Sequence, residues 1–398
     1  MTPTRRTLLL GSLGAVGLAA CSGDDGSSPP SQTTSPIASS TRPSATQPSS
    51  TQPSATPSSS APATSQSPQA SPAPLKIGEP QELVTGLTTP WGVRPLDDQT
   101  LLVSERDTGK IKTISDGKAT EVLTVADVQT SSEGGLLGLE LTDDRLFVYV
   151  TTDAGNRVVA YQRNGTRPSS GFTNPTTVLD EIPAAGFHNG GQLAIGPDKH
   201  LYIATGDATG DATERQLAQD KNSVAGKILR ITQDGAIPRD NPFGNAVWSM
   251  GHRNVQGLAF ADNGDLWSCE FGEKTADEIN LITRGGNYGW PEVEGNQGQR
   301  SPFLAPKLTW EPTASSSPSA LAFAHGHLRV GALMGRGVFQ VPVEGQNLGE
   351  ATKLLGDQYG RIRAVVPWRD GIVFGSSNTD GRTLPRAGDD RLLYLPLI

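Results

Sequence analysis

The sequence predicts an all-β protein whose folded part is a six-bladed β-propeller, preceded by an export signal and a disordered linker. A polar turn followed by a short apolar strand recurs six times, and the strands begin at Leu101, Leu146, Leu201, Leu266, Leu328 and Ile372. These starts lie 44 to 65 residues apart, which leaves room for three further strands in each unit. No long amphipathic helical pattern is present, and 46 glycines suit a chain with many turns. A pair of stacked β-domains is the alternative.

We expect residues 1–20 to be a cleaved signal peptide. A segment that resembles a twin-arginine export signal (residues 4–9) leads into an apolar run (residues 8–20), which is too short to span a bilayer. Residues 18–21 resemble a lipoprotein box. We therefore expect Cys21 to be acylated, to become the first mature residue, and to anchor the protein to the outer face of the cell membrane. A generic export signal followed by a chance cysteine is the alternative.

We expect residues 22–74 to form a disordered tether. The segment is almost wholly Ser, Pro, Thr, Ala, Gln and Gly, and Arg42 is its single charged residue after Asp24 and Asp25. Such a composition cannot bury enough apolar surface to offset the entropy that ordering would cost. At about 3 Å per residue for an extended Pro-rich chain, the tether could hold the folded part as much as ~150 Å from the membrane.

The folded domain is expected to run from residue 75 to residue 398 as one propeller. Besides the six recurring strands, short apolar segments predict strands at Ile111 to Ile114, Val158 to Gln162 and Ile228 to Ile231. Their positions between the recurring strands agree with several strands in each blade.

Composition and charge exclude some classes of protein. The net charge of −8 argues against a dedicated nucleic-acid binder. Once Cys21 is acylated, Cys269 is the one thiol left, so no intramolecular disulfide can form and packing must hold the fold. Cys269 lies in the apolar strand from Leu266 to Glu270, where we expect a buried structural thiol and not a nucleophile.

His188 is the first candidate for chemistry. It precedes Asn189-Gly190-Gly191, and glycines let the backbone turn sharply and approach a ligand. Histidine titrates near neutral pH and can accept a proton there. A surface or structurally satisfied histidine is the alternative. The remaining histidines lie in polar turns or lack a glycine-rich segment of their own: His200, His252, His325 and His327.

Arg253 and Asn254 form the second candidate. They stand in a GHRNVQG segment just before the apolar strand from Leu258 to Phe260. An arginine can bind a carboxylate with two parallel hydrogen bonds or polarise a carbonyl oxygen, and an asparagine can donate or accept. A structural arginine that ties two loops together is the alternative.

Two further groups of residues are candidate ligand sites. Arg361 and Arg363 are two apart, so in a strand both guanidinium groups would face the same side and could bind more than one carboxylate. A solvated charge pair at a strand edge is the alternative. The acidic turn at 272–278 carries three carboxylates and several backbone carbonyls, an oxygen-rich arrangement that suits calcium, although most acidic turns bind nothing.

The order of these and other short motifs resembles the glucose/sorbosone dehydrogenase family. The motifs are TPWG (89–92), SER (104–106), EGGLLG (133–138), HNGG (188–191), TGD (205–207), GKILR (226–230), DGAIPRDNPF (234–243), GHRNVQGLAF (251–260), DEIN (277–280), GGNYGWP (285–291) and GRIR (360–363). The resemblance covers nearly the whole folded domain. The family includes soluble quinoprotein glucose dehydrogenase and aldose dehydrogenases, which are six-bladed propellers that use pyrroloquinoline quinone (PQQ) and calcium. The resemblance implies an enzyme that oxidises an aldose sugar at C1 to the lactone.

The resemblance also implies catalytic roles. His188 would be the base that removes the proton of the anomeric hydroxyl as hydride leaves C1 for the quinone. Arg253 would stabilise negative charge on the reduced quinone oxygen, and Asn254 would be a neighbouring cofactor contact.

Two ligand-binding roles follow from the same resemblance. Arg361 and Arg363 match the arginine pair that binds the cofactor's carboxylates. The backbone carbonyls of Gly272 and Glu273 match the positions that hold the calcium, which would act as a Lewis acid on the quinone carbonyl.

The sequence departs from the glucose-oxidising branch of the family at several positions. Where that branch has a lysine that reaches the cofactor, this chain has the turn 331–337, in which Arg336 is the candidate replacement. Phe187 stands where the branch has an aspartate, Glu133 where it has a glutamine, and Glu273 where it has a proline. Glu133 and Arg336 are therefore retained as candidate cofactor contacts.

Two other function classes stay open at this point. One is a non-catalytic propeller that binds a protein or carbohydrate partner. The other is a calcium-dependent lactonase-like hydrolase, which would need a metal held on the axis by acidic and amide side chains from different blades. His188, Arg253 and the Arg361/Arg363 pair favour a dehydrogenase whose partners are a sugar substrate, an electron acceptor of unknown kind and, through the lipid anchor, the membrane.

Overall fold

The computed structural model describes residues 76–165, 171–208, 211 and 213–398. The predicted signal peptide (1–20), the predicted lipidation site Cys21 and the predicted linker (22–74) lie outside the described residues. In the described part strands dominate, and the helical elements are short 3-10 turns at Glu214–Gln219 (η2), Thr313–Ser315 (η3) and Asp357–Tyr359 (η4). None of the helices in these residues is long and apolar enough to span a membrane.

The strands form six antiparallel sheets, which we number as blades one to six. Blade one comprises β2 (Pro90–Pro95), β3 (Leu101–Glu105), β4 (Lys110–Ser115) and β5 (Lys118–Thr124). Blade two comprises β6 (Leu136–Leu141), β7 (Arg145–Thr152), β8 (Gly155–Arg163) and β9 (Phe172–Ile182). Blade three comprises β10 (Leu193–Ile195), β11 (Leu201–Ala204), β12 (Lys227–Ile231) and β13 (Val247–Met250).

The remaining blades follow the same plan. Blade four comprises β14 (Val255–Phe260), β15 (Leu266–Glu270), β16 (Asp277–Ile282) and β17 (Leu308–Trp310). Blade five comprises β18 (Pro318–Ala324), β19 (His327–Ala332), β20 (Gly337–Glu344), β21 (Asn347–Leu348) and β22 (Thr352–Lys353). Blade six comprises β23 (Ile362–Trp368), β24 (Gly371–Ser376), β25 (Leu392–Pro396) and the N-terminal β1 (Gln81–Val84).

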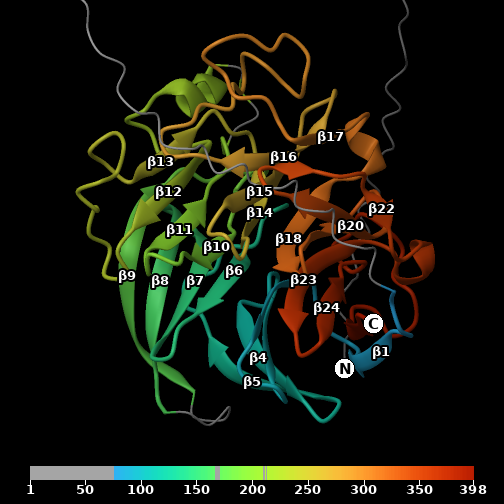
Figure 1. Cartoon of the computed structure of the whole chain (residues 1–398). Coiled ribbons are helices and arrows are strands. Elements are labelled where there is room, and N and C mark those ends of the chain that lie inside the picture. Colours follow the sequence, from blue (N-terminus) through green and yellow to red (C-terminus); the bar gives the residue numbers. More distant parts are fainter. Residues whose placement is uncertain (1–75, 166–170, 209–210, 212) are drawn as a thin grey trace, which may run out of the picture. The chain divides into compact units, whose positions relative to one another are not determined.

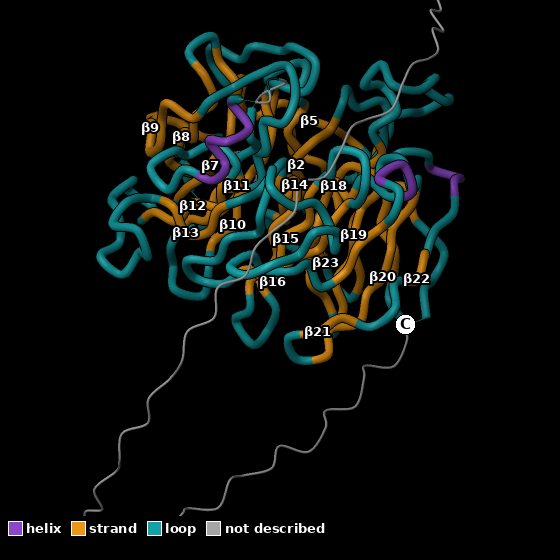
Figure 2. The backbone as a smooth tube through the Cα atoms, turned by 90° about the horizontal axis from the view of Figure 1, so that it is seen from above, coloured by secondary structure: helices purple, strands orange, loops and turns teal. Residues whose placement is uncertain are grey.

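The six blades surround a common axis, as Figures 1 and 2 show from two directions. The first strand of each blade packs against the first strands of its neighbours, in the order β2, β6, β10, β14, β18, β23 and back to β2. The N-terminal strand closes the ring, because β1 pairs with β25 as the outer strand of blade six, with Gln81 opposite Tyr394. The predicted six-bladed propeller is therefore confirmed.

The six recurring sequence segments are the second strands of the blades, namely β3, β7, β11, β15, β19 and β24. These strands have a neighbouring strand on each side, and every residue of β3 and β15 is buried. Burial on both faces explains why they are nearly continuous apolar runs in the sequence. The strands predicted at 111–114, 158–162 and 228–231 fall within β4, β8 and β12.

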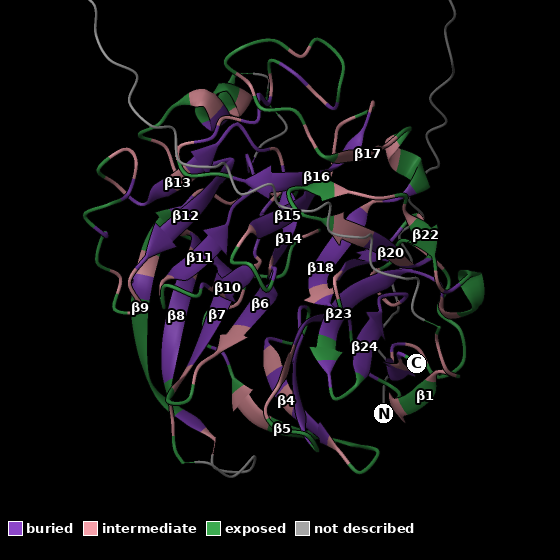
Figure 3. Ribbon diagram, viewed as in Figure 1, coloured by how far each residue is buried: buried purple, intermediate pink, exposed green. Residues whose placement is uncertain are grey.

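Apolar side chains from adjacent blades form the core, and Figure 3 shows the inner strands as its most buried part. Trp91 of β2 packs with Phe147 of β7 and Leu229 of β12. Cys269 is fully buried beside Trp267, and burial raises the pKa of its thiol well above the ordinary value. The expected structural thiol is therefore what the structure contains.

The strand directions bring one set of loops to one end of the ring. The first two strands of each blade are antiparallel, so the start of the first strand and the end of the second lie at the same end. Because the first strands of all blades line the axis, the segments before them and the segments after the second strands meet around it. We call this end of the propeller the loop end.

Candidate functional site

All of the residues predicted for the site lie at the loop end. One group precedes the first strand of its blade: Glu133 in blade two, His188 in blade three, Arg253 and Asn254 in blade four, and Arg361 in blade six. A second group follows the second strand of its blade: Gly272 and Glu273 in blade four, and Arg336 in blade five. Arg363 is the second residue of β23. The fold thus gathers side chains from five blades that are as much as 230 residues apart in the sequence (133 to 363).

His188 is held in a left-handed backbone conformation, with φ of 60°, which is uncommon for residues other than glycine. Its carbonyl oxygen accepts a hydrogen bond from the Ala208 amide at 3.1 Å. A Cβ atom at Gly206 would collide with the same carbonyl oxygen, so the close approach of the two loops requires glycine there. These contacts hold the HNGG segment (188–191) against the TGD segment (205–207).

The imidazole of His188 is oriented by Asp207. The His188 Nδ1 lies 2.8 Å from Oδ1 of Asp207, whose side chain is fully buried. The second oxygen of Asp207 accepts a hydrogen bond from Trp290 Nε1 at 2.9 Å. Because an ionised carboxylate only accepts, this contact suits the tautomer with the hydrogen on Nδ1, in which Nε2 is the accepting nitrogen. With 14% of the side chain exposed, His188 can meet a ligand.

Arg253 lies beside the same tryptophan. Its guanidinium carbon is 5.3 Å from the centre of the Trp290 ring, and its Nη1 donates to the Phe271 carbonyl at 3.2 Å. Burial lowers the pKa of Arg253, while the nearby carboxylates of Asp207 and Glu273 oppose that shift. Its Nε is buried and has no hydrogen-bond partner among the described residues.

Asn254 is fully buried beside the loop that carries His188. Its Oδ1 accepts the Gly190 amide hydrogen at 3.1 Å, and Gln256 Nε2 lies 3.4 Å from the same oxygen. The Nδ2 donor of Asn254 has no partner among the described residues. A buried donor without an acceptor costs about 1–3 kcal/mol, so this amide is suited to an oxygen of a bound ligand.

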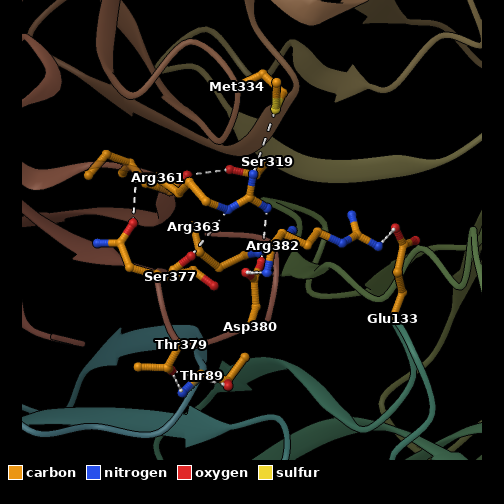
Figure 4. Close-up of polar contacts among 12 residues, drawn as sticks. Thr89, Glu133, Ser319, Met334, Arg361, Arg363, Ser377, Thr379, Asp380 and Arg382 are labelled. Carbon is orange, nitrogen blue, oxygen red and sulfur yellow. Dashed lines mark hydrogen bonds and ion pairs between the residues drawn. The ribbon is translucent and has the colours of Figure 1, made fainter. Parts of the chain in front are cut away.

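Arg361 and Arg363 lie close to Asp380, as Figure 4 shows. Arg361 Nη2 binds Oδ2 of Asp380 at 2.9 Å, in a pair whose side chains are 5% and 2% exposed. Arg363 donates to Gln256 and lies 5.6 Å from the centre of the Trp91 ring. No carboxylate in the described part of the chain forms a salt bridge with Arg363.

The positive charge of Arg363 is costly where it lies. Burial, together with the neighbouring Arg106 and Arg361, lowers the pKa of Arg363 to about 9. The group still carries its charge at neutral pH, because guanidinium groups hold their protons firmly. A buried cation with a neutral amide as its hydrogen-bond partner is suited to an anionic ligand.

Glu133 does not present a free carboxylate to a ligand. Its Oε2 accepts the backbone amide hydrogen of His188 at 3.0 Å, and its Oε1 accepts from Arg382 Nη2 at 2.9 Å. Burial would raise the pKa of Glu133, but the His188 amide and Arg382 together hold it below its ordinary value. The predicted direct cofactor contact by Glu133 stays a prediction.

Arg336 stays a prediction as well. It is exposed, with φ of 45°, in the turn that follows β19. From the same turn, Met334 brings its Sδ to 3.8 Å from Arg361 Nη1 while half of its side chain remains exposed. Methionine and not a cation therefore lies against the arginine pair at this turn.

The backbone amides of Gly272 and Glu273 donate hydrogen bonds to carboxylates. The Gly272 amide donates to Asp277 at 3.1 Å, and the Glu273 amide donates to Glu294 at 2.6 Å. The Glu273 side chain binds Arg215 at 2.9 Å. No hydrogen bond to either carbonyl oxygen is found in the described residues, and these residues contain no group of three or more His, Cys, Asp or Glu side chains that could hold a metal. A cation here would be bound by backbone carbonyls.

Several partners in this network were not predicted from the sequence. They are Asp207, Trp290, Gln256, Asp380 and Arg382. The first three stand inside motifs that the sequence already singles out, but nothing local shows that Asp207 and Trp290 meet His188 and Arg253. Asp380 and Arg382 lie in a polar segment after β24 that has no recognisable signal. A cavity of about 440 Å³ is lined by none of the site residues and lies between outer strands around Tyr161.

The family model of glucose/sorbosone dehydrogenases matches residues 87–386. A PQQ-bound aldose sugar dehydrogenase from Streptomyces coelicolor is 41% identical, has a TM-score of 0.78, and is matched over 83% of this chain and 100% of its own. A glucose dehydrogenase-like oxidoreductase from Thermus thermophilus is 37% identical with a TM-score of 0.72, over 81% of this chain and 100% of its own.

A sequence relative extends the match. The aldose sugar dehydrogenase of Escherichia coli is 30% identical over 77% of this chain and 90% of its own length. The family model and these relatives cover the same blades that carry His188, Arg253 and the arginine pair. The chain therefore belongs to the glucose/sorbosone dehydrogenase family.

Proposed function

We propose that this protein is a PQQ- and calcium-dependent dehydrogenase that oxidises aldose sugars at C1 to the lactone. Family membership and the similarity to a PQQ-bound aldose sugar dehydrogenase support the proposal. The observation that carries it is that the loop end holds both an imidazole oriented by a buried carboxylate and a buried arginine pair. A propeller that only bound a partner would have no need for both.

The residues present fit PQQ. The cofactor carries three carboxylates, and Arg363 is a buried cation that lacks a carboxylate partner among the described residues. Quinone oxygens need donors, and the buried Asn254 Nδ2 and Arg253 Nε have no other acceptor in this part of the chain. Arg361 and Arg363 would hold the carboxylates, and Arg253 and Asn254 would bind the quinone oxygens. When bound, PQQ accepts the hydride from the sugar and calcium polarises its carbonyl.

Calcium would be held by the carbonyl oxygens of Gly272 and Glu273. Calcium favours oxygen ligands, including backbone carbonyls. The peptide groups that contain these two carbonyls carry the Glu273 and Lys274 amides, and both amides donate to Glu294, at 2.6 and 2.9 Å, which fixes the two peptide planes. Four consecutive amides, from Glu273 to Ala276, donate to one oxygen of Glu294, so the turn is rigid before any ion binds.

In the proposed reaction, Nε2 of His188 takes the proton of the anomeric hydroxyl. Asp207 keeps Nδ1 protonated and stabilises the imidazolium that forms. Trp290 holds the second oxygen of Asp207, so the carboxylate cannot rotate away from the imidazole. Arg253, stacked against Trp290, supplies positive charge where negative charge develops on the accepting side.

We also propose that the protein is exported and anchored to the outer face of the cell membrane through an acylated Cys21. The lipoprotein-box sequence before Cys21 supports this proposal. Metabolic labelling with a fatty acid should label the full chain and leave Cys21→Ser unlabelled, and the variant should be released from the membrane fraction. Equal labelling of both proteins would refute the anchor.

The enzymatic proposal is tested with the purified protein, PQQ and Ca²⁺. Cofactor binding is measured by titration, and reduction of an artificial dye is followed with a panel of aldoses. We expect PQQ to bind at micromolar concentration and at least one aldose to reduce the dye. Absence of binding at that concentration would overturn the enzymatic function. Chelation of calcium from the loaded protein should abolish turnover, and addition of Ca²⁺ should restore it.

A further inference from the structure

The loop between β24 and β25, residues 377–391, connects the two sides of the site. Asp380 in this loop binds Arg361 at 2.9 Å, and two residues later Arg382 binds Glu133 at 2.9 Å. Arg382 and Glu133 are 249 residues apart in the sequence and belong to connections of blades six and two. Figure 4 shows the Arg382 side chain extending from the arginine pair toward Glu133.

Glu133 links Arg382 to His188, the proposed base. The oxygen that does not bind Arg382 accepts the His188 amide hydrogen at 3.0 Å. That amide belongs to a residue with φ of 60°, a conformation that does not persist without surrounding contacts. The contacts on His188 come from Glu133 at its amide, Ala208 at its carbonyl and Asp207 at its ring. The first of these is the one that Arg382 controls.

We propose that Arg382 is a positioning residue for His188 and acts through Glu133. The ion pair directs one carboxylate oxygen toward the His188 amide and so sets where the imidazole lies relative to the bound sugar. This inference rests on the proposed function, in which His188 is the base. Neither family membership nor the sequence motifs pointed to Arg382.

The exposure of the pair determines what its loss would do. The Arg382 side chain is 42% exposed and that of Glu133 is 16% exposed. An ion pair with an exposed partner contributes about 0–1 kcal/mol to stability, so its removal should barely change unfolding. A base displaced by about 1 Å can lose on the order of 10²-fold in rate, so the same removal should be visible in kcat.

The test compares Arg382→Ala with Arg386→Ala in the full, PQQ-loaded protein. Arg386 lies in the same loop and donates to the Asp357 and Gln358 carbonyls, so its removal loosens the loop without touching Glu133. We expect Arg382→Ala to lower kcat by about tenfold or more, with little change in the KM for the sugar or in the midpoint of thermal unfolding. Arg382→Lys keeps the charge and should recover much of the loss. Equal losses of kcat in both alanine variants would overturn the proposal.

A double-mutant cycle checks that the effect passes through Glu133. Glu133→Gln keeps an oxygen for the His188 amide but removes the ion pair. In this background, Arg382→Ala should change kcat by less than about twofold, because the two residues act as one unit. Independent, multiplying losses would contradict the proposal. Weaker PQQ binding with unchanged kcat would show instead that Arg382 contacts the cofactor.

A measurement without cofactor separates this inference from the proposed function. The chain has 5 histidines, so the ring signals of His188 can be assigned by NMR with one substitution at a time. In the cofactor-free protein, those signals should move in Arg382→Ala and remain in place in Arg386→Ala. Unmoved His188 signals in Arg382→Ala would overturn the positioning role. Moved signals would support it even if the protein proved not to oxidise sugars.

Discussion

The two sides of the site are built in opposite ways. We call the part around His188, Asp207 and Trp290 the base side. Here both carboxylate oxygens of Asp207 form hydrogen bonds, one with His188 and the other with Trp290. We call the part around Arg361 and Arg363 the arginine side. Here Arg361 has a single carboxylate partner, Asp380, and the partner of Arg363 is the neutral amide of Gln256. The hydrogen bonds that orient His188 are therefore complete without a ligand, whereas the arginine side carries buried positive charge that an anionic ligand would neutralise.

This difference predicts that the base side affects the reaction of the sugar and that the arginine side affects binding of the cofactor. In the proposed reaction, an imidazole that is already oriented needs no rearrangement when the sugar binds, which keeps the barrier low. Unneutralised buried charge destabilises the free protein and is recovered as binding energy when a carboxylate arrives. Substitutions on the base side should change turnover, and substitutions on the arginine side should change cofactor affinity.

The largest effect is expected for His188→Ala. Removal of a general base typically costs 10²–10⁴-fold, so kcat should fall by about 10³-fold while PQQ affinity stays the same. His200→Ala is the matched control, because His200 lies near Asp198 and Arg230 on the flank of blade three. Turnover that survives in His188→Ala would show that another group removes the proton.

Asp207→Asn should have the next largest effect, with kcat lower by about 10²-fold, the lower end of what general-base catalysis contributes. In asparagine an NH₂ donor replaces one of the two oxygens and faces the hydrogen of either His188 Nδ1 or Trp290 Nε1, so the imidazole can turn or change tautomer. Trp290→Phe removes the second donor alone and should lose less. Wild-type kcat in Asp207→Asn would mean that the carboxylate does not orient the base.

Arg363→Met tests the arginine side. We expect PQQ to bind at least about tenfold more weakly, because a charged hydrogen bond contributes about 1.5–3 kcal/mol. The cofactor-free protein should be as stable as the wild type or more stable, because burial already disfavours the charge of Arg363. Affinity is measured by titration and stability by denaturant unfolding.

Arg329→Met is the control for that experiment. Arg329 is also a fully buried arginine, but it lies in β19 beside Gln340 and away from the site. This control should leave PQQ affinity unchanged. Unchanged affinity in Arg363→Met itself would remove that residue from the cofactor site.

The smallest effect is expected for Arg336→Ala. Its side chain is exposed, and exposed charges contribute about 0–1 kcal/mol, so PQQ affinity should fall by less than about fivefold. A loss of tenfold or more, measured by the same titration, would show that the turn after β19 closes onto the cofactor. Arg336 would then belong to the arginine side, as its position in the sequence suggests.

Much of the fold could be predicted from the sequence because the second strand of each blade is buried on both faces. Its residues are mostly apolar in every blade, so the pattern recurs from Leu101 to Ile372. The candidate residues were also found locally, because His188, Arg253 and Arg361 stand in compact motifs next to first strands. The partners could not be found in this way, since Arg382 reaches Glu133 across 249 residues.

By itself, the sequence determined the all-β class, the number of blades and which side chains can do chemistry, since burial patterns and residue types are local properties of the chain. Tertiary structure alone decided how those side chains are used. In the folded protein Asp207 contacts His188, Glu133 forms an ion pair with Arg382, and Arg336 is exposed to solvent. The physical reason is that closing the ring brings loops from every blade to one end, and contacts across that end depend on the position of each blade and not on distance along the chain.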